Sequence, residues 1–198
     1  MSIHTTGDSH SIIGWYDIGI ISHHLGPVLC YSFGKDPLNR CDIRTFNIED
    51  GDIIIFCFGE IDCRCHIHKY INETTTYQHI IDCIIDAYFE AIKINITRSE
   101  LKLKHICVYN VVPTIQRDKV KENPEFPFLG TDEERKSYVL YFNERLNEKC
   151  KEYNYIFFNI YDKYTDKNGF LNVKLSDSNV HIKNGVHIKN FIYENLVI

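Results

Sequence analysis

Apolar residues fall along the chain in short continuous runs, separated by longer stretches in which apolar and polar positions alternate with helical spacing. The runs are rich in β-branched and aromatic residues, and Gly, Pro or Asp residues lie at several of their ends. This pattern is typical of strands that are buried on both faces. We therefore predict five strands, at residues 2–6, 28–33, 52–58, 105–112 and 155–161.

Three of the intervening stretches have the pattern of amphipathic helices. Between residues 76 and 96 the apolar positions recur on one helical face. In the stretch 131–153, Thr131 and Glu134 have the spacing of a capping box, and Val139, Phe142 and Leu146 form the apolar stripe. The pattern predicts a third helix at residues 184–196.

Buried strands that alternate with amphipathic helices indicate a parallel sheet covered on both faces. The predicted fold is an α/β three-layer α/β/α sandwich of the flavodoxin-like kind, with about five parallel strands in one domain spanning residues 1–198. In such sheets, ligands bind beyond the carboxyl ends of the strands. Candidate chemistry is therefore sought at those ends.

Composition narrows the class of protein. Hydrophobic residues make up 44% of the chain and charged residues 25%, as in ordinary globular proteins. The net charge is -5 and the basic residues are scattered, so we expect no nucleic-acid partner. The chain starts without the pattern of a secretory signal, and its apolar runs are far shorter than a membrane span. We predict a cytoplasmic protein with no membrane partner, and its oligomeric state is left open.

Eight cysteines raise the question of disulfides or a metal. With no export signal, free thiols are expected. The segment CRCHIH, residues 63–68, has Cys-x-Cys rather than Cys-x2-Cys spacing, and no second pair of ligands follows at metal-binding spacing. In an extended segment, its cysteines and histidines would lie on opposite faces. We therefore predict no metal and no cofactor. A metal-dependent protein is kept as the weakest hypothesis, behind the enzyme and the binding module described below.

Two polar segments carry the elements of a serine nucleophile. Ser9 follows the first predicted strand, where a hydroxyl can be supported by backbone N–H groups, although a helix-capping serine is an equally good interpretation. Asp177 lies four residues before His181, so a loop could bring its carboxylate to the imidazole. Taken alone, that second segment is more typical of a surface loop.

Together these residues resemble the SGNH/GDSL family of serine esterases and acyltransferases. The block Gly7-Asp8-Ser9 matches that family in full. Its second block, a glycine after the second strand, is best matched by Gly34, with Gly26 as the weaker choice.

Two further blocks depart from the family pattern. Its Gly-x-Asn-Asp block corresponds to Gly59-Glu60-Ile61-Asp62, where Ile61 replaces the asparagine. Its Asp-x-x-His block corresponds to the segment before His181, where Ser178 holds the usual place of the acid and Asp177 precedes it. The chain would therefore be a divergent member.

The resemblance implies that Ser9 attacks an acyl carbonyl, that His181 takes its proton and that Asp177 orients His181. It also implies that backbone N–H groups of Ser9 and Gly34 meet the oxyanion. Because Ile61 cannot donate a hydrogen bond, we consider Arg64 a candidate replacement donor, a binder of an anionic substrate group or an ion-pair partner of nearby acids. The remaining candidates for oxyanion or substrate binding are Glu60, Asp62 and Asp8.

Other candidates are expected to play lesser roles. We interpret His10, His23 and His24 as structural, with the His10 side chain pointing away from Ser9, and His187 is a second choice for the base. The segment 113–130 is long for a loop and carries Phe126 and Phe128, so it is either a substrate wall or a solvated excursion.

The leading prediction is an enzyme that hydrolyses or transfers an acyl group, most simply acetyl, on a carbohydrate or similar polar acceptor. Its partner would be a small-molecule or glycan ester or acyl acceptor. No residue decides between hydrolase and transferase, because both use the same acyl-enzyme. The alternative is a catalytically degenerate glycan-binding module that retains the groove.

Overall fold

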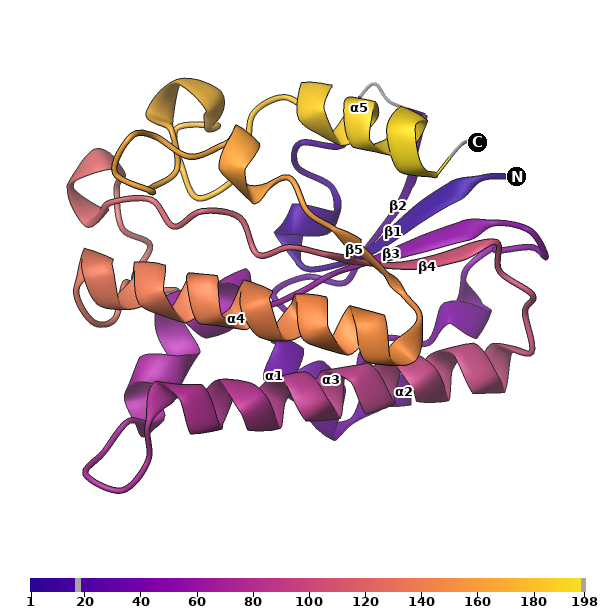
Figure 1. Cartoon of the computed structure of the whole chain (residues 1–198), viewed down its shortest axis with the longest axis horizontal. Helices are drawn as coiled ribbons and strands as arrows, with labels where there is room; N and C mark the ends of the chain where they lie inside the picture. Colours follow the sequence, from indigo (N-terminus) through magenta and orange to yellow (C-terminus); the bar gives the residue numbers. More distant parts are fainter. Residues whose placement is uncertain (17–18, 197–198) are drawn as a thin grey trace.

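The computed structural model describes residues 1–16 and 19–196, and its centre is a sheet of five parallel strands in the order β2-β1-β3-β4-β5 (Figure 1). The predicted α/β class and parallel sheet are confirmed. The strands are β1 (Ile3–Gly7), β2 (Ile21–His24), β3 (Ile53–Cys57), β4 (His105–Tyr109) and β5 (Ile156–Phe158).

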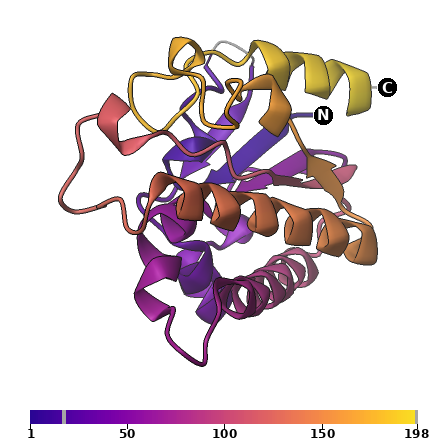
Figure 2. The ribbon, with the colours of Figure 1, turned by 60° about the vertical axis from the view of Figure 1, so that its left-hand side comes forward.

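Helices cover both faces of the sheet and complete three layers (Figures 1 and 2). One apolar core contains Ile54 and Phe56 of β3, and side chains of α3 (Tyr77–Ser99) and α4 (Asp132–Tyr153) pack on it. The other core contains Ile53 and Ile55, and α5 (Val186–Asn195) packs there. Alternate residues of one strand thus enter opposite cores, which is why β3 is apolar at every position.

The long helices begin where the sequence predicts. The Thr76 side chain accepts a hydrogen bond from the His79 N–H and caps α3. Thr131 and Glu134 form the predicted capping box at the start of α4, with each side chain bonded to the other's backbone N–H. These caps satisfy donors that the first helical turn leaves without partners.

The predicted strand at residues 28–33 is wrong, because this segment starts helix α1 (Cys30–Lys35). The Asp62 carboxylate accepts hydrogen bonds from the Cys30 N–H at 2.7 Å and the Tyr31 N–H at 3.1 Å, which favours a helical first turn. The second strand is instead β2, with the sequence ISHH. Since β2 lies at the sheet edge and is partly exposed, it lacks the apolar run used to find the other strands.

The segment after β3 is also not extended. Residues Asp62–His66 form a π-helical turn, η3, and Ile67–Tyr70 form a 3-10 turn, η4. Cys63 and Cys65 are buried in it, and the Cys65 thiol lies 3.1 Å from the Ile61 carbonyl. The remaining short helices are α2 (Pro37–Arg40), η1 (Ser9–Ser11), η2 (Ile43–Thr45), η5 (Arg117–Lys119), η6 (Tyr161–Lys163) and η7 (Val173–Leu175).

The eight cysteines all lie in the described part of the chain and are free thiols, as predicted. Seven of them are buried and Cys83 is exposed. Among the described helices, none combines the length and the apolar character that a membrane crossing requires.

Candidate active site

Ser9 lies at the carboxyl end of β1, as the first residue of the 3-10 turn η1. The Asp8 side chain caps this turn by accepting a hydrogen bond from the His10 N–H at 2.8 Å. Gly7 is the last residue of β1, and a Cβ on Gly7 would lie 1.9 Å from the Cys57 carbonyl oxygen of β3. The glycine thus lets β1 end tightly against β3, two residues before Ser9.

Ser9, His181 and Asp177 form a continuous hydrogen-bonded series. The Ser9 Oγ lies 2.8 Å from His181 Nε2, and His181 Nδ1 lies 2.8 Å from Asp177 Oδ2. With the carboxylate accepting from Nδ1–H, the neutral imidazole presents Nε2 as an acceptor to the Ser9 hydroxyl. This is the arrangement that a serine nucleophile, its base and an orienting acid require.

The surroundings of His181 favour the neutral form of its imidazole. Burial and the charge of His10 lower the pKa of His181 below its usual value, and Asp177 only partly opposes them. An imidazole with a lowered pKa remains able to accept a proton at neutral pH. The charge state of His181 therefore suits a general base.

A tight turn brings Asp177 to His181. Residues Ser176 and Ile182 pair as an antiparallel bridge, and Ser178 between them has a left-handed backbone with φ of 70°. Asp177 Oδ1 accepts from the backbone N–H groups of Asn179 and His181, which leaves Oδ2 for the imidazole. The turn thus accommodates the additional residue between acid and base that sets this chain apart from the Asp-x-x-His pattern.

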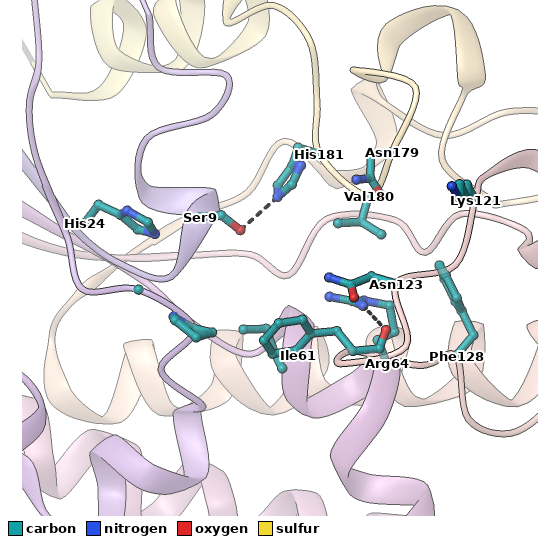
Figure 3. A pocket seen from close by; sticks show the side chains of 13 residues that line it. Ser9, His24, Ile61, Arg64, Lys121, Asn123, Phe128, Asn179, Val180 and His181 are labelled. Atoms are coloured by element: carbon teal, nitrogen blue, oxygen red, sulfur yellow. Dashed lines mark hydrogen bonds between the residues drawn. The ribbon is translucent and has the colours of Figure 1, made fainter.

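A cavity of about 300 Å³ opens beside Ser9 and His181 (Figure 3). Ile61 and Arg64 lie across it from the two site residues. Apolar and polar side chains are mixed in its wall. The residues lining this Ser9 cavity are Ser9, His24, Gly26, Pro27, Ile61, Arg64, Lys121, Asn123, Phe126, Phe128, Asn179, Val180 and His181.

The prediction that Gly34 meets the oxyanion is wrong. Gly34 lies inside α1, and a Cβ there would lie 2.8 Å from the Ala87 Cβ of α3, so its role is close helix packing. Gly26, the weaker choice in the sequence, lines the Ser9 cavity. Within the described residues, the backbone N–H groups of Ser9 and Gly26 donate no hydrogen bond, so neither is committed to another acceptor.

Ile61 lines the Ser9 cavity at the position where the resembled family has asparagine, and it offers no donor. Two amide side chains from other segments, Asn123 and Asn179, line the same cavity. They follow no motif in the sequence, and only their place in the wall reveals them.

Arg64 is committed to an ion pair. Its Nε and Nη2 donate to Glu60 at 2.7 and 3.0 Å, and its Nη1 donates to the Phe126 carbonyl at 2.6 Å. Burial works to raise the pKa of Glu60, but the charges of Arg64 and His10 outweigh it and hold that pKa below its usual value. Of the alternatives for Arg64, the ion pair is the one present, and it anchors the loop of Phe126 to the cavity wall.

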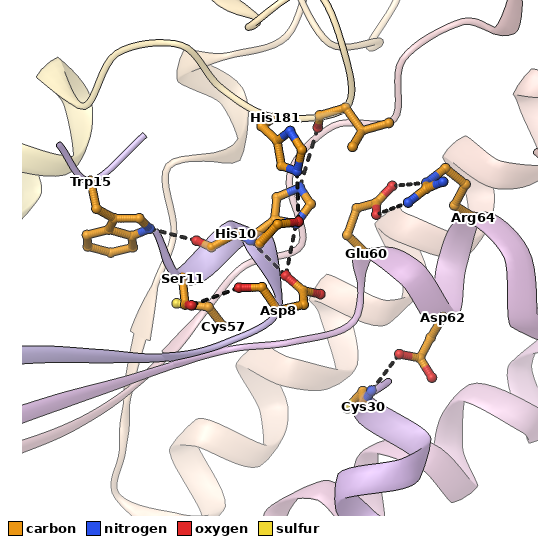
Figure 4. A network of polar contacts seen from close by, with 12 residues as sticks. Asp8, His10, Ser11, Trp15, Cys30, Cys57, Glu60, Asp62, Arg64 and His181 are labelled. Atoms are coloured by element: carbon orange, nitrogen blue, oxygen red, sulfur yellow. Dashed lines mark hydrogen bonds and ion pairs between the residues drawn. The ribbon is translucent and has the colours of Figure 1, made fainter. Parts of the chain in front are cut away.

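The structure does not bring Glu60, Asp62 or Asp8 into the wall of the Ser9 cavity, so their predicted substrate contacts are wrong. Asp62 is fully buried and accepts from the first-turn N–H groups of α1. Burial raises the pKa of Asp62 to about 7, against the opposing effect of those donors. Asp8 is buried beneath the site and contacts His10 (Figure 4).

The other histidines differ in place. His10 does not point away from the site as predicted, because its ring centroid lies 4.6 Å from that of His181. His24 lines the Ser9 cavity, whereas His23 stacks on Phe46. His187 packs edge-on against Tyr164 and does not line the cavity.

The long segment 113–130 contributes a wall of the Ser9 cavity, the first of its two predicted alternatives. Phe126 and Phe128 line the cavity, and their ring centroids lie 5.9 and 5.5 Å from the Arg64 guanidinium carbon. The loop is held by Arg117, which donates to the Phe128 carbonyl and pairs with Glu122.

No group of three or more His, Cys, Asp or Glu residues within 1–16 and 19–196 is arranged to hold a metal ion. The run 63–68 is folded into helical turns with Cys63 and Cys65 buried, so its thiols and imidazoles do not converge.

The fold can be compared with known proteins. No family model and no curated protein sequence matches the chain. Among solved structures, a GDSL-like lipase from Bacteroides thetaiotaomicron is 12% identical with a TM-score of 0.64, over 98% of this chain and 86% of the other. A member of the lipolytic G-D-S-L family from Veillonella parvula is 14% identical, with a TM-score of 0.59 over 99% and 98%.

An acetyl xylan esterase is likewise similar, at 14% identity and a TM-score of 0.59 over the whole of both chains. At these identities, the likeness concerns the arrangement of the backbone. The resemblance indicated by Gly7-Asp8-Ser9 and His181 is thus confirmed at the level of architecture, and the chain has the fold of the SGNH/GDSL hydrolases.

Proposed function

We propose that this protein is a serine esterase or acyltransferase that works through an acyl-enzyme on Ser9. The observation that carries the proposal is the pair of 2.8 Å contacts that join Ser9 to His181 and His181 to Asp177. Ser9 comes from the start of the chain, Asp177 and His181 come from one turn near its end, and the three side chains meet in the order that this chemistry needs. The degenerate binding module is less well supported, because it gives no reason for both contacts to persist.

In the proposed reaction, Ser9 Oγ attacks the acyl carbonyl carbon while its proton passes to His181 Nε2. Asp177 stabilises the resulting imidazolium, and the N–H groups of Ser9 and Gly26 bind the oxyanion. Collapse of the intermediate expels the alcohol, which takes the proton from His181. Water, or the hydroxyl of an acceptor, then attacks the acyl-enzyme, with His181 again accepting a proton, and Ser9 is regenerated.

We propose a short acyl group, most simply acetyl, on a carbohydrate or similar polar acceptor. The Ser9 cavity of about 300 Å³ is at the small end of ligand sites, which favours a short acyl chain. The polar groups of Lys121, Asn123 and Asn179 suit hydroxyl-rich acceptors, and Phe126 and Phe128 offer apolar faces. The acetyl xylan esterase with a similar fold is in line with this choice.

Labelling with a fluorophosphonate tests the nucleophile. The purified protein should gain one phosphonyl group, and the labelled peptide should contain Ser9. Ser9→Ala should abolish labelling and His181→Ala should slow it strongly, whereas Ser137→Ala, on the exposed face of α4, should label normally. A folded protein that stays unlabelled would contradict the proposal.

The acyl group is tested by comparing p-nitrophenyl acetate with p-nitrophenyl octanoate. We expect kcat/KM to be higher for the acetate by about tenfold or more, because a long chain exceeds the cavity. Release of acetate from acetylated oligosaccharides would extend the result to the proposed acceptor. Preference for the octanoate would contradict the short-acyl proposal while leaving Ser9 as nucleophile.

A further inference from the structure

His10, the residue after the candidate nucleophile, lies in the centre of a buried polar network under the site (Figure 4). It is only 5% exposed, and its ring centroid lies 4.6 Å from that of His181. Neither the acyl chemistry nor the resembled motif assigns it a role. A histidine so close to the base will affect the base through its charge.

Both nitrogens of His10 face acceptors. Nδ1 lies 3.0 Å from Asp8 Oδ1, and Nε2 lies 3.4 Å from the Val180 carbonyl oxygen. A carbonyl oxygen can only accept, so Nε2 carries a proton, and a proton on Nδ1 lets the ring donate to the carboxylate. Both contacts are hydrogen bonds at the same time only when His10 is an imidazolium.

The buried charges around the ring favour this state. Asp8 Oδ2 has no hydrogen-bond partner in the described part of the chain, so His10 is the counter-charge for a buried carboxylate. Burial alone would lower the pKa of His10, but Asp8 and Glu60 outweigh it and the pKa is raised. Glu60 is itself paired with Arg64.

The two hydrogen-bonded ends of His10 connect the nucleophile turn to the base. Asp8 caps the turn that holds Ser9, and Val180 immediately precedes His181. The backbone carbonyl of His10 is fixed in turn by the Trp15 indole N–H at 2.7 Å. The His10 ring thus lies beneath His181 and links Asp8 of the Ser9 turn to the residue before His181 (Figure 4).

We propose that His10 is a positioning residue for this site: a buried imidazolium that ties the His181 loop to the Ser9 turn and, by its positive charge, keeps His181 unprotonated and able to accept the proton of Ser9. The part that His10 would play in turnover rests on the proposed function. The charge coupling between the two rings does not depend on it.

Histidine side-chain nitrogen NMR tests the coupling without any substrate. In the wild-type protein, His10 should remain doubly protonated across the pH range in which His181 loses its proton. In His10→Gln, the pH midpoint of His181 should rise by roughly one unit, because a positive charge within about 4–6 Å has been removed. His79→Gln, on the exposed side of α3, is the matched control and should leave that midpoint unchanged.

Kinetics give the second readout. The acid limb of kcat/KM in His10→Gln should move upward with the NMR midpoint, so that the loss of rate is larger at pH 6 than at pH 8. If His10→Gln fails to fold, the NMR titration of the wild-type protein still tests the proposal. A His10 ring that is neutral while His181 titrates would overturn it. An unmoved His181 midpoint in folded His10→Gln would overturn it too.

The two proposals fail separately. Absence of phosphonyl labelling at Ser9 would remove the serine-esterase function and leave the coupling between the rings measurable. Normal labelling together with an unchanged His181 midpoint would retain the function and remove the role of His10.

Discussion

Asp177 reaches His181 across four residues of chain, with its Oδ2 2.8 Å from the imidazole Nδ1 and its Oδ1 on the backbone N–H of the same histidine. One carboxylate therefore fixes both the ring and the backbone of the base. We expect Asp177→Asn to lower kcat by about 10³–10⁴-fold, because an amide can donate to Nδ1 and favour the wrong tautomer. Steady-state kinetics on p-nitrophenyl acetate measures this, with Asp118→Asn as an exposed control. Near-normal activity would mean that another acceptor orients His181.

Ser178 occupies the left-handed region in the turn between Asp177 and His181, with φ of 70°. This backbone costs an L-residue about 1–2 kcal/mol, whereas glycine adopts it freely. Ser178→Gly should therefore raise the free energy of unfolding by about 1 kcal/mol, less than the full strain because glycine also loosens the unfolded chain. Ser178→Val should lower it. Urea unfolding of the three proteins checks the order, and equal stability of the valine and glycine variants would contradict it.

The lowered pKa of His181 predicts activity on the acid side of neutrality. Burial and the charge of His10 place that pKa below the usual 6.5, so at any acidic pH more of the base is neutral than in an ordinary histidine. The acid limb of kcat/KM should accordingly have its midpoint below pH 6.5. A pH profile between 4.5 and 8 checks this, and a midpoint above 7 would show that His181 is not the titrating base.

Glu60 and Arg64 form a nearly buried ion pair, with side chains 9% and 10% exposed. Removing one partner leaves a buried charge, so Glu60→Gln and Arg64→Met should each cost about 3–5 kcal/mol in the free energy of unfolding. Replacing both, as in Glu60→Gln with Arg64→Met, should cost clearly less than the sum of the two single losses. Chemical unfolding of the single and double variants measures this coupling, and additive losses would argue against a stabilising pair.

Gly34 lets α1 approach α3, since its Cβ would meet the Ala87 Cβ at 2.8 Å. Gly34→Ala should lower the free energy of unfolding by about 1–3 kcal/mol through overpacking, without changing kcat/KM of the folded protein. Adding Ala87→Gly should restore part of the stability by returning the space. A loss of kcat/KM in a fully folded Gly34→Ala protein would contradict a role for Gly34 in helix packing alone.

Much of the architecture followed from local pattern. Continuous apolar runs identify β3, β4 and β5, helical periodicity identifies α3 and α4, and the capping box at Thr131 sets the start of α4 to the residue. These features depend on burial and hydrogen bonds within one segment, so they can be read from that segment alone. The edge strand β2 was not predicted, because an edge strand that is partly exposed need not be apolar.

Part of the candidate site can likewise be predicted from local sequence, and part depends on the tertiary fold. Ser9, Asp177 and His181 are marked by their motifs, but the sequence leaves open whether residues 9 and 181 meet at all. The tertiary fold decides that, and it also assigns Gly26 rather than Gly34 to the cavity, commits Arg64 to Glu60 and brings His10 under His181. Residue type determines what chemistry a side chain can perform, whereas contacts between segments far apart in the chain determine which partner it meets.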